Sequence, residues 1–149
     1  MNKSGLLSLC CLILLISIIA TGCVLERYIK IEENNGITTF LDSASISYSK
    51  ETDIATFTLK AIPNKATKAK WAEDKHSNNI KVNPYLEADY LLYANKIKIS
   101  KRKLSLGEMT FMDNKKRIIL KIPRQGREKW EPIEFAWMEK IYQEVAKRI

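Results

Sequence analysis

Two hydrophobic patterns divide the chain, and the first is one long apolar stretch. No charged residue occurs from Ser4 to Leu25, and the core from Leu6 to Ile19 is interrupted only by two serines and two cysteines. Preceded by the basic Lys3 and followed by the small residues Ala20-Thr21-Gly22, this stretch is typical of a secretory signal peptide. Because the charge-free run from Leu6 to Leu25 is also about as long as a membrane-spanning helix, an uncleaved anchor is the alternative.

The second pattern is the alternation of apolar and polar residues that is typical of half-buried strands. From Ile54 to Ile62, residues 55, 57, 59 and 61 are apolar, and residues 56, 58 and 60 are polar. Ile37 to Leu41 is rich in β-branched and aromatic residues, and Tyr28 to Ile31 indicates an edge strand. From Ala88 to Ile122 such signals recur three times, which predicts a three-stranded antiparallel meander.

Turn residues separate these segments. Asn34-Asn35-Gly36 predicts a tight turn, since Asn and Gly adopt positive φ at low cost. Asp42-Ser43-Ala44-Ser45 predicts a short polar break after the strand before it. Ser100-Lys101-Arg102 and Asp113-Asn114-Lys115-Lys116 are the expected turns of the meander. Gly107 is a candidate β-bulge, at the point where the apolar face of its strand changes phase.

One segment has the periodicity of a helix. Apolar residues recur every four positions near the C-terminus and charged residues fill the other side, which predicts an amphipathic helix from about Glu134 to Arg148. Glu144 and Arg148 are spaced for an ion pair along it. Residues 63–87 show no clear period, and we expect a mobile loop there or a short helix near residues 66–72. Trp71 is then either exposed or folded over an edge of the core.

These elements predict an α+β fold: an antiparallel β-sheet of about five to six strands with a C-terminal amphipathic helix packed on one face. Residues 1–22 are the expected signal peptide, and residues 23–149 form a single domain that is long enough to bury its own core. Within this domain we expect a lead over residues 23–36, the sheet over 37–122 and the helix over 134–148.

Cysteine placement sharpens the interpretation of the N-terminal stretch. Cys23 follows Gly22 directly, and it resembles the lipobox cysteine of bacterial lipoproteins, which carries diacylglycerol and acyl chains such as palmitate. We therefore expect Cys23 to anchor the protein to a membrane of the bacterial envelope, facing outside the cytoplasm. Val24 in place of Asp favours the outer membrane if the source has two. No cysteine follows Cys23, so we expect no disulfide and no thiol chemistry.

The residues give no indication of catalysis. His76 is the only histidine, and no second ligand is spaced to hold a metal with it. Glu32-Glu33 and Glu73-Asp74 are adjacent pairs and not facing carboxylates, and the sequence has no glycine-rich phosphate loop and no nucleophile motif. We therefore expect no enzyme activity, no catalytic residue, no cofactor and no metal.

Charge gives the strongest functional indication. The chain has a net charge of +8, and without residues 1–22 it keeps 24 basic and 17 acidic residues, a net charge of +7. Twelve basic and three acidic residues lie between Lys96 and Lys129. The candidate ligand-binding patch consists of eight of these basic residues: Lys96, Lys98, Lys101, Arg102, Lys103, Lys115, Lys116 and Arg117.

Such a patch attracts acidic macromolecules, which include polysaccharides, proteins and lipid headgroups. The alternative is that lysines along exposed strands only keep the protein soluble, because they discourage edge-to-edge aggregation. We expect no nucleic-acid partner, because the protein is exported and no exposed aromatic residues are interleaved with the basic ones.

Several segments recur in a familiar order: Ile37 to Ile46, then Lys60-Ala61-Ile62-Pro63, the charged meander, Trp130 with Ile133, and Glu139 to Val145. This order resembles the surface-adhesin protein E family of small bacterial lipoproteins, over most of residues 28–146. The resemblance implies an antiparallel sheet with the C-terminal helix against its concave side. It also implies binding to host matrix and serum proteins.

Members of that family commonly have Pro-x-Ser before the helix and a cysteine near its end that clamps it to the sheet. This chain has Phe135-Ala136-Trp137 and Ala146 at those places, so we expect packing by Trp137 and Phe135 to hold the helix instead. Two hypotheses follow. The first is a surface-exposed, adhesin-like binding module for an acidic macromolecule or a host extracellular protein. The second is a structural or accessory periplasm-facing envelope lipoprotein without adhesin activity.

Overall fold

The computed structural model describes residues 26–74, 87–124 and 126–149. The expected signal peptide, the lipid-attachment residue Cys23 and the lone histidine His76 lie outside these ranges, as do residues 75–86 of the expected loop. Within the described ranges, no helix has the length and apolar character that crossing a membrane requires.

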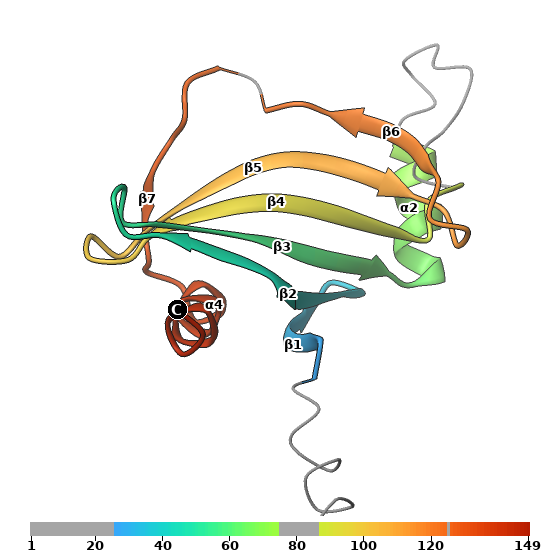
Figure 1. Ribbon diagram of the computed structural model, residues 1–149. Helices are drawn as coiled ribbons and strands as arrows, with labels where there is room; N and C mark the ends of the chain where they lie inside the picture. The colour runs from blue at the N-terminus through green and yellow to red at the C-terminus, as the bar shows by residue number, and fades with distance from the viewer. Residues whose placement is uncertain (1–25, 75–86, 125) are drawn as a thin grey trace, which may run out of the picture.

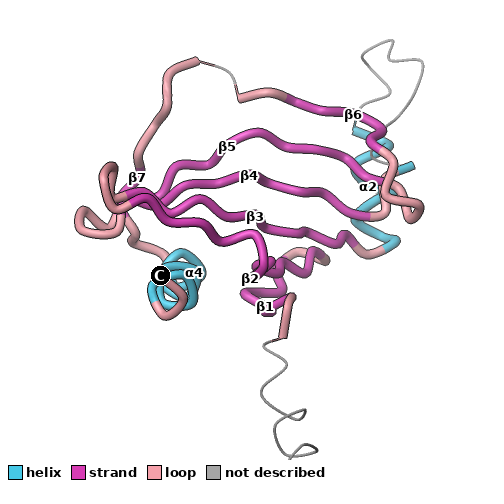
Figure 2. Tube along the Cα trace, viewed as in Figure 1, coloured by secondary structure: helices cyan, strands magenta, loops and turns pink. Residues whose placement is uncertain are grey.

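Six strands lie side by side in the order in which they occur in the sequence, so the sheet is an antiparallel meander (Figures 1 and 2). A short seventh strand pairs with the fifth. The strands are β1 (Tyr28–Asn34), β2 (Ile37–Ser49), β3 (Ile54–Pro63), β4 (Tyr90–Lys98), β5 (Lys103–Met112), β6 (Ile118–Ile122) and β7 (Glu131–Pro132). The described helices are α2 (Lys65–Asp74) and α4 (Ala136–Ala146). The predicted α+β class is confirmed.

The three expected tight turns are confirmed, and each contains at least one residue with positive φ. Asn35 and Gly36 have φ angles of 50° and 74° between β1 and β2. Arg102, with φ 48°, turns β4 into β5, and Lys116, with φ 63°, turns β5 into β6. Hairpins favour such left-handed residues because their backbone twist matches that of the paired strands.

The expected polar break at residues 42–45 is instead an irregularity inside one strand. β2 continues to Ser49, and its pairing with β3 shifts register between Asp42 and Ser47. The side chains there do bond backbone groups, as short polar residues do in turns. The Thr58 amide donates to Ser45 Oγ at 2.8 Å, and Ser45 Oγ donates to the Asp42 carbonyl at 2.6 Å. These bonds replace the interrupted ladder, so the strand bends without ending.

The β-bulge predicted at Gly107 is confirmed. Between Tyr93 and Asn95 of β4, the partner residue in β5 changes from Met109 to Leu106, so β5 holds one extra residue. A Cβ atom at Gly107 would lie 1.9 Å from the carbonyl oxygen of Ala94. Only glycine allows this approach of the two strands.

One face of the sheet carries the core. In β3 the apolar residues 55, 57, 59 and 61 are each at most 5% exposed, which confirms the predicted alternation. Met138, Ile141 and Val145 of α4 pack against residues 55, 57 and 59. Trp71 of α2 packs beside Ala61 of the same face. Both described helices therefore lie on one side of the sheet, and α4 lies on the side toward which β1 and β2 bend (Figure 1).

The helix α4 differs in two respects from the expectation. It begins at Ala136, because Phe135 has an extended backbone (φ −93°, ψ 147°), and it ends at Ala146. Trp137 packs partly against the core, but Phe135 is 60% exposed and does not replace the missing clamp. The expected ion pair of Glu144 with Arg148 is present at 2.8 Å.

The hairpin between β4 and β5 also holds α4. The guanidinium of Arg102 forms an ion pair with Glu139 and lies 4.4 Å from the ring centroid of Tyr142. The Tyr142 hydroxyl donates to the Ile99 carbonyl at 3.4 Å. Arg102 therefore connects the sheet to the helix at the end of β4.

Residues 65–74 form the helix α2, which corresponds to the short helix expected near residues 66–72 and is slightly longer. Its N-terminus is capped by Asn64, whose side-chain oxygen accepts a hydrogen bond from the Thr67 amide at 2.8 Å. The Thr67 hydroxyl donates to the Asn35 carbonyl at 3.0 Å, which connects the helix to the first hairpin. Trp71 folds over the edge of the core.

Candidate functional site

Neither described helix covers the sheet face opposite the core. The even-numbered residues of β3 point to it, and they are polar from Thr56 to Lys60. Cross-strand pairing places Lys96 of β4 beside Thr56, and Ser105 of β5 beside Lys96. We call this surface the open face.

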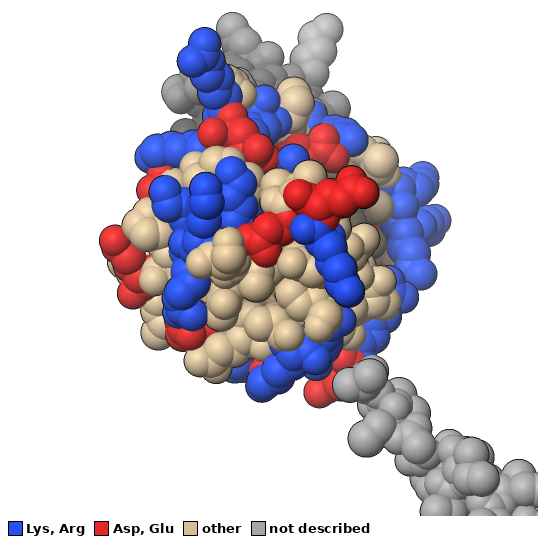
Figure 3. Space-filling view, turned by 60° about the vertical axis from the view of Figure 1, so that its left-hand side comes forward, with Lys and Arg blue, Asp and Glu red and all other residues tan. Residues whose placement is uncertain are grey.

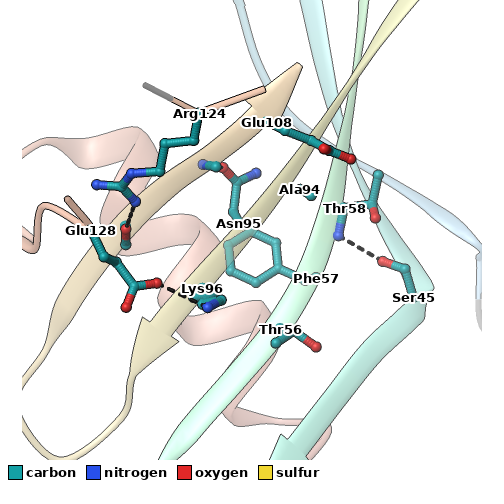
Figure 4. A pocket seen from close by; sticks show the side chains of 12 residues that line it. Ser45, Thr56, Phe57, Thr58, Ala94, Asn95, Lys96, Glu108, Arg124 and Glu128 are labelled. Carbon is teal, nitrogen blue, oxygen red and sulfur yellow. Dashed lines mark hydrogen bonds and ion pairs between the residues drawn. The ribbon is translucent and has the colours of Figure 1, made fainter. Parts of the chain in front are cut away.

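The open face is hollowed near its centre. The hollow has a volume of about 410 Å³, in the range of sites for small ligands. It is lined by residues of β2, β3, β4, β5 and the segment after β6 (Figure 4). In this view Arg124 and Glu128 lie on one side, Thr58 and Ser45 on the other. The bulge at Gly107 forms part of the wall, because it shifts the course of β5 there.

Arg124 is fixed at the rim of the hollow by neutral acceptors. Its Nη1 donates to Ser105 Oγ and, at 2.9 Å, to the Leu106 carbonyl, and its Nη2 donates to the Arg127 carbonyl at 3.0 Å. Between its pairings with β6 and β7, strand β5 lacks a neighbour at Leu106. The guanidinium supplies a donor at that gap, and Ser105 beneath it is 1% exposed. Arg124 forms no ion pair with any described residue.

The other charges around the hollow are paired. Lys96 lies 2.9 Å from a carboxylate oxygen of Glu128, and Lys121 lies 2.8 Å from one of Glu108. All four side chains are between one third and about one half exposed, so each pair is weak and exchanges readily with other partners.

Lysine side chains lie over aromatic rings on the open face. Lys60 Nζ lies 4.9 Å from the ring centroid of Tyr28 and 4.4 Å from that of Tyr90, and Lys98 Nζ lies 4.4 Å from the ring of Trp130. Such cation–π contacts hold the ammonium groups over the faces of the rings. Burial raises the pKa of Tyr90 above its ordinary value. Among residues of β2 to β6 and the segment after β6, more cations than carboxylates lie on this face: Lys60, Lys96, Lys98, Lys103, Lys121 and Arg124 against Asp42, Glu108 and Glu128.

The structure separates the predicted patch into groups. Lys101, Arg102 and Lys103 lie at the hairpin where β5 begins, whereas Lys115, Lys116 and Arg117 lie where it ends. The ten residues of β5 span about 30 Å, several Debye lengths at physiological salt. Lys96 and Lys98 lie on β4, on the open face. One face of the molecule shows Lys and Arg side chains on several sides of an uncharged central area, with acidic side chains among them (Figure 3).

Several of the predicted patch residues have a partner. Arg117 lies 2.6 Å from a carboxylate oxygen of Asp113, and the hydrogen bond from its amide lowers the pKa of that carboxyl below its ordinary value. Arg102 is bound to α4, Lys96 to Glu128, and Lys98 to the Trp130 ring. The remaining four, Lys101, Lys103, Lys115 and Lys116, form no ion pair within the described ranges.

The hollow itself is absent from the sequence-based prediction. Its threonines occupy the polar positions of a predicted strand, but Arg124 belongs neither to a predicted element nor to the candidate patch. One feature of the sequence could have indicated it. A segment that follows an edge strand and contains an arginine can cross back over the sheet before the next strand begins. No group of three or more potential metal ligands occurs in the parts of the chain that the structure describes.

The comparison with known proteins shows a similarity in fold but no close relative in sequence. No family model and no curated protein matches the sequence. Solved structures of Haemophilus influenzae protein E do match. The selenomethionine form is 13% identical with a TM-score of 0.54, and the match covers 84% of this chain and 89% of that one. Crystal form II is also 13% identical (TM-score 0.52, coverage 84% and 91%), and a third structure is 14% identical (TM-score 0.54, coverage 84% and 87%). This chain is therefore similar to protein E in fold.

Proposed function

We propose that the protein is a lipid-anchored component of the bacterial envelope whose sheet domain is a non-enzymatic, adhesin-like module for acidic macromolecules. One observation carries the binding role: the described helices leave a whole sheet face uncovered, and cations outnumber carboxylates on it. Such a face attracts anionic ligands, most strongly within about one Debye length of it. The fold similarity to protein E is consistent with this role and does not identify the ligand.

The sequence supports the anchor. The uncharged run from Ser4 to Leu25 contains Cys23 directly after Gly22, and the chain that follows Cys23 has no other thiol. Two or more acyl chains on that residue hold a protein to a bilayer, whereas one chain exchanges. The test is metabolic labelling with a fatty-acid analogue in cells that express the wild type or Cys23→Ala. We expect label on the wild type only, and label on the variant would contradict the anchor.

A second candidate function is an accessory envelope lipoprotein without adhesin activity. It is favoured by the pairing of many cations with carboxylates and by the separation of the two basic hairpins. Protease treatment of intact cells distinguishes the two. Degradation of residues 26–149 supports the surface-exposed module, and protection until the envelope is opened supports the accessory protein.

A further inference from the structure

We propose that the hollow of the open face binds a carboxylated sugar unit of an acidic polysaccharide, with Arg124 and Lys96 at its carboxylate. This inference rests on the proposed function, because it names the ligand class of the same face. The proposed binding site is therefore the hollow and not the two basic hairpins. The hollow is lined by strands of the sheet and by the segment that follows β6 (Figure 4).

The charge of Arg124 provides the first argument. Its three hydrogen bonds go to a hydroxyl and two carbonyls, all neutral, so no carboxylate among the described residues balances the positive charge of the half-buried guanidinium. A guanidinium has five N–H donors, and Nε and one Nη2 hydrogen remain for a ligand. A fixed guanidinium with free donors binds a carboxylate at a small entropic cost.

The hydroxyl-bearing side chains provide the second argument. Thr56 and Thr58 line the hollow, and their hydroxyls have no hydrogen-bond partner among the described residues. Glu108 and Glu128 stand at its edge and accept hydrogen bonds, which suits a ligand rich in hydroxyl donors. Cations, carboxylates and hydroxyls in one hollow match a sugar that carries both a carboxylate and several hydroxyls.

The same surroundings disfavour an acidic peptide. β3 and β4 are interior strands whose backbone groups are paired on both sides, so no peptide can add to their edges. A run of acidic side chains would also meet Glu108 and Glu128, whereas a sugar separates its carboxylates by hydroxyl-bearing ring atoms. Base stacking is disfavoured, since lysines lie over the rings of Tyr28, Tyr90 and Trp130.

The experiment uses the full-length protein in detergent micelles and measures binding by calorimetry. The probes are trigalacturonate, the neutral trisaccharide maltotriose, the peptide triglutamate and the polymer dextran sulfate. We expect trigalacturonate to bind at least about tenfold more tightly than maltotriose or triglutamate, because only it has both the carboxylates and the hydroxyls.

Variants then locate the site. Lys96→Met should weaken trigalacturonate binding about tenfold, and Thr56→Val severalfold. Lys115→Met is the matched control, since it removes one positive charge at the far hairpin, and it should change binding less than twofold. Arg124→Lys keeps the charge but loses the planar fork, and it should also weaken binding. Thr56 is exposed, and Lys96 forms only the partly exposed ion pair with Glu128, so these variants test the site even if Arg124→Lys unfolds.

Each outcome decides one point. Equal effects of Lys96→Met and Lys115→Met would overturn the hollow as the site and leave the proposed function standing. Triglutamate binding as tight as trigalacturonate binding would overturn the sugar assignment. If neither trigalacturonate nor dextran sulfate binds, this inference and the acidic-ligand function both fail.

Discussion

Gly107 is a single residue on which the course of β5 depends. Its hydrogen atoms lie where a methyl group would be 1.9 Å from the Ala94 carbonyl oxygen, and that oxygen belongs to backbone that cannot turn away. Gly107→Ala should therefore lower the free energy of unfolding by about 3 kcal/mol, the upper end for overpacked sites. Urea denaturation of the two proteins measures this difference.

Gly126→Ala is the control for Gly107→Ala. Gly126 has φ 77° but nothing within 4 Å of its would-be Cβ atom, so only the left-handed backbone is penalised, by about 1 kcal/mol. Equal losses in the two variants would show that the close approach at the bulge contributes nothing.

Asp53 connects two hairpins through its carboxylate. It accepts hydrogen bonds from the Ser100 hydroxyl, from the Ser100 amide at 2.9 Å and from the Tyr48 hydroxyl at 3.1 Å. The Ser100 hydroxyl contributes most to lowering the pKa of Asp53 below its ordinary value. A lowered folded-state pKa stabilises the fold above the unfolded-state pKa of about 3.9, and this contribution is lost as pH falls through the folded-state value.

Asp53→Asn should therefore be less stable than the wild type at neutral pH, and the difference should shrink toward about pH 2. Thermal unfolding across this pH range gives the measurement. Glu51→Gln, an exposed change on the same hairpin, should leave the pH dependence as it is in the wild type. A stability difference between Asp53→Asn and the wild type that stays constant down to low pH would contradict a stabilising role of the ionised Asp53 carboxylate.

Among the elements, α4 is held to the sheet by packing and by Arg102, without a covalent clamp. Ile141 is fully buried between the helix and the sheet. Ile141→Ala should cost about 2–5 kcal/mol of unfolding free energy. Phe135→Ala, at a site 60% exposed, should cost less than about 0.5 kcal/mol. Urea denaturation measures both changes. A large loss of unfolding free energy in Phe135→Ala would show that Phe135 does help to pack the helix.

The sequence predicts best those elements in which the apolar positions are also the buried positions. β3 and α4 each bury one face against one core, so their periods of two and four residues appear directly in the sequence. α2 has no apolar stripe, because it contacts the core through Trp71 and is fixed by the Asn64 cap and the Thr67 bond to the first hairpin. β2 contains a polar stretch whose side chains complete the ladder, and local pattern cannot distinguish that from a turn.

At the scale of the whole molecule, the hollow shows why a site is harder to predict than a fold. Its lining comes from strands β2 to β5 and from the segment that contains Arg124. Residues 45 and 124 are neighbours across the hollow only because the sheet order and the return of the chain after β6 bring them together. The sequence identifies the excess of cations correctly. However, Lys103 and Lys115 are close in the sequence but lie at opposite ends of β5.

This separation leads to a prediction for the two basic hairpins. Their charges lie about 30 Å apart, and the Debye length at physiological salt is about 8 Å. The double changes Lys101→Gln with Lys103→Gln, and Lys115→Gln with Lys116→Gln, should therefore act independently on binding of a sulfated tetrasaccharide. In the fourfold variant the losses of binding free energy should add to within about 0.5 kcal/mol.

Calorimetry at several salt concentrations measures these losses, which should shrink as salt rises because the lysines are exposed. A coupling above about 1 kcal/mol between the two double changes would mean that both hairpins contact one ligand as a single patch. In that case the hollow between them would be the middle of a larger site. Additive losses, with Lys96→Met having the larger effect on trigalacturonate, would instead place recognition in the hollow and leave the hairpins to long-range attraction.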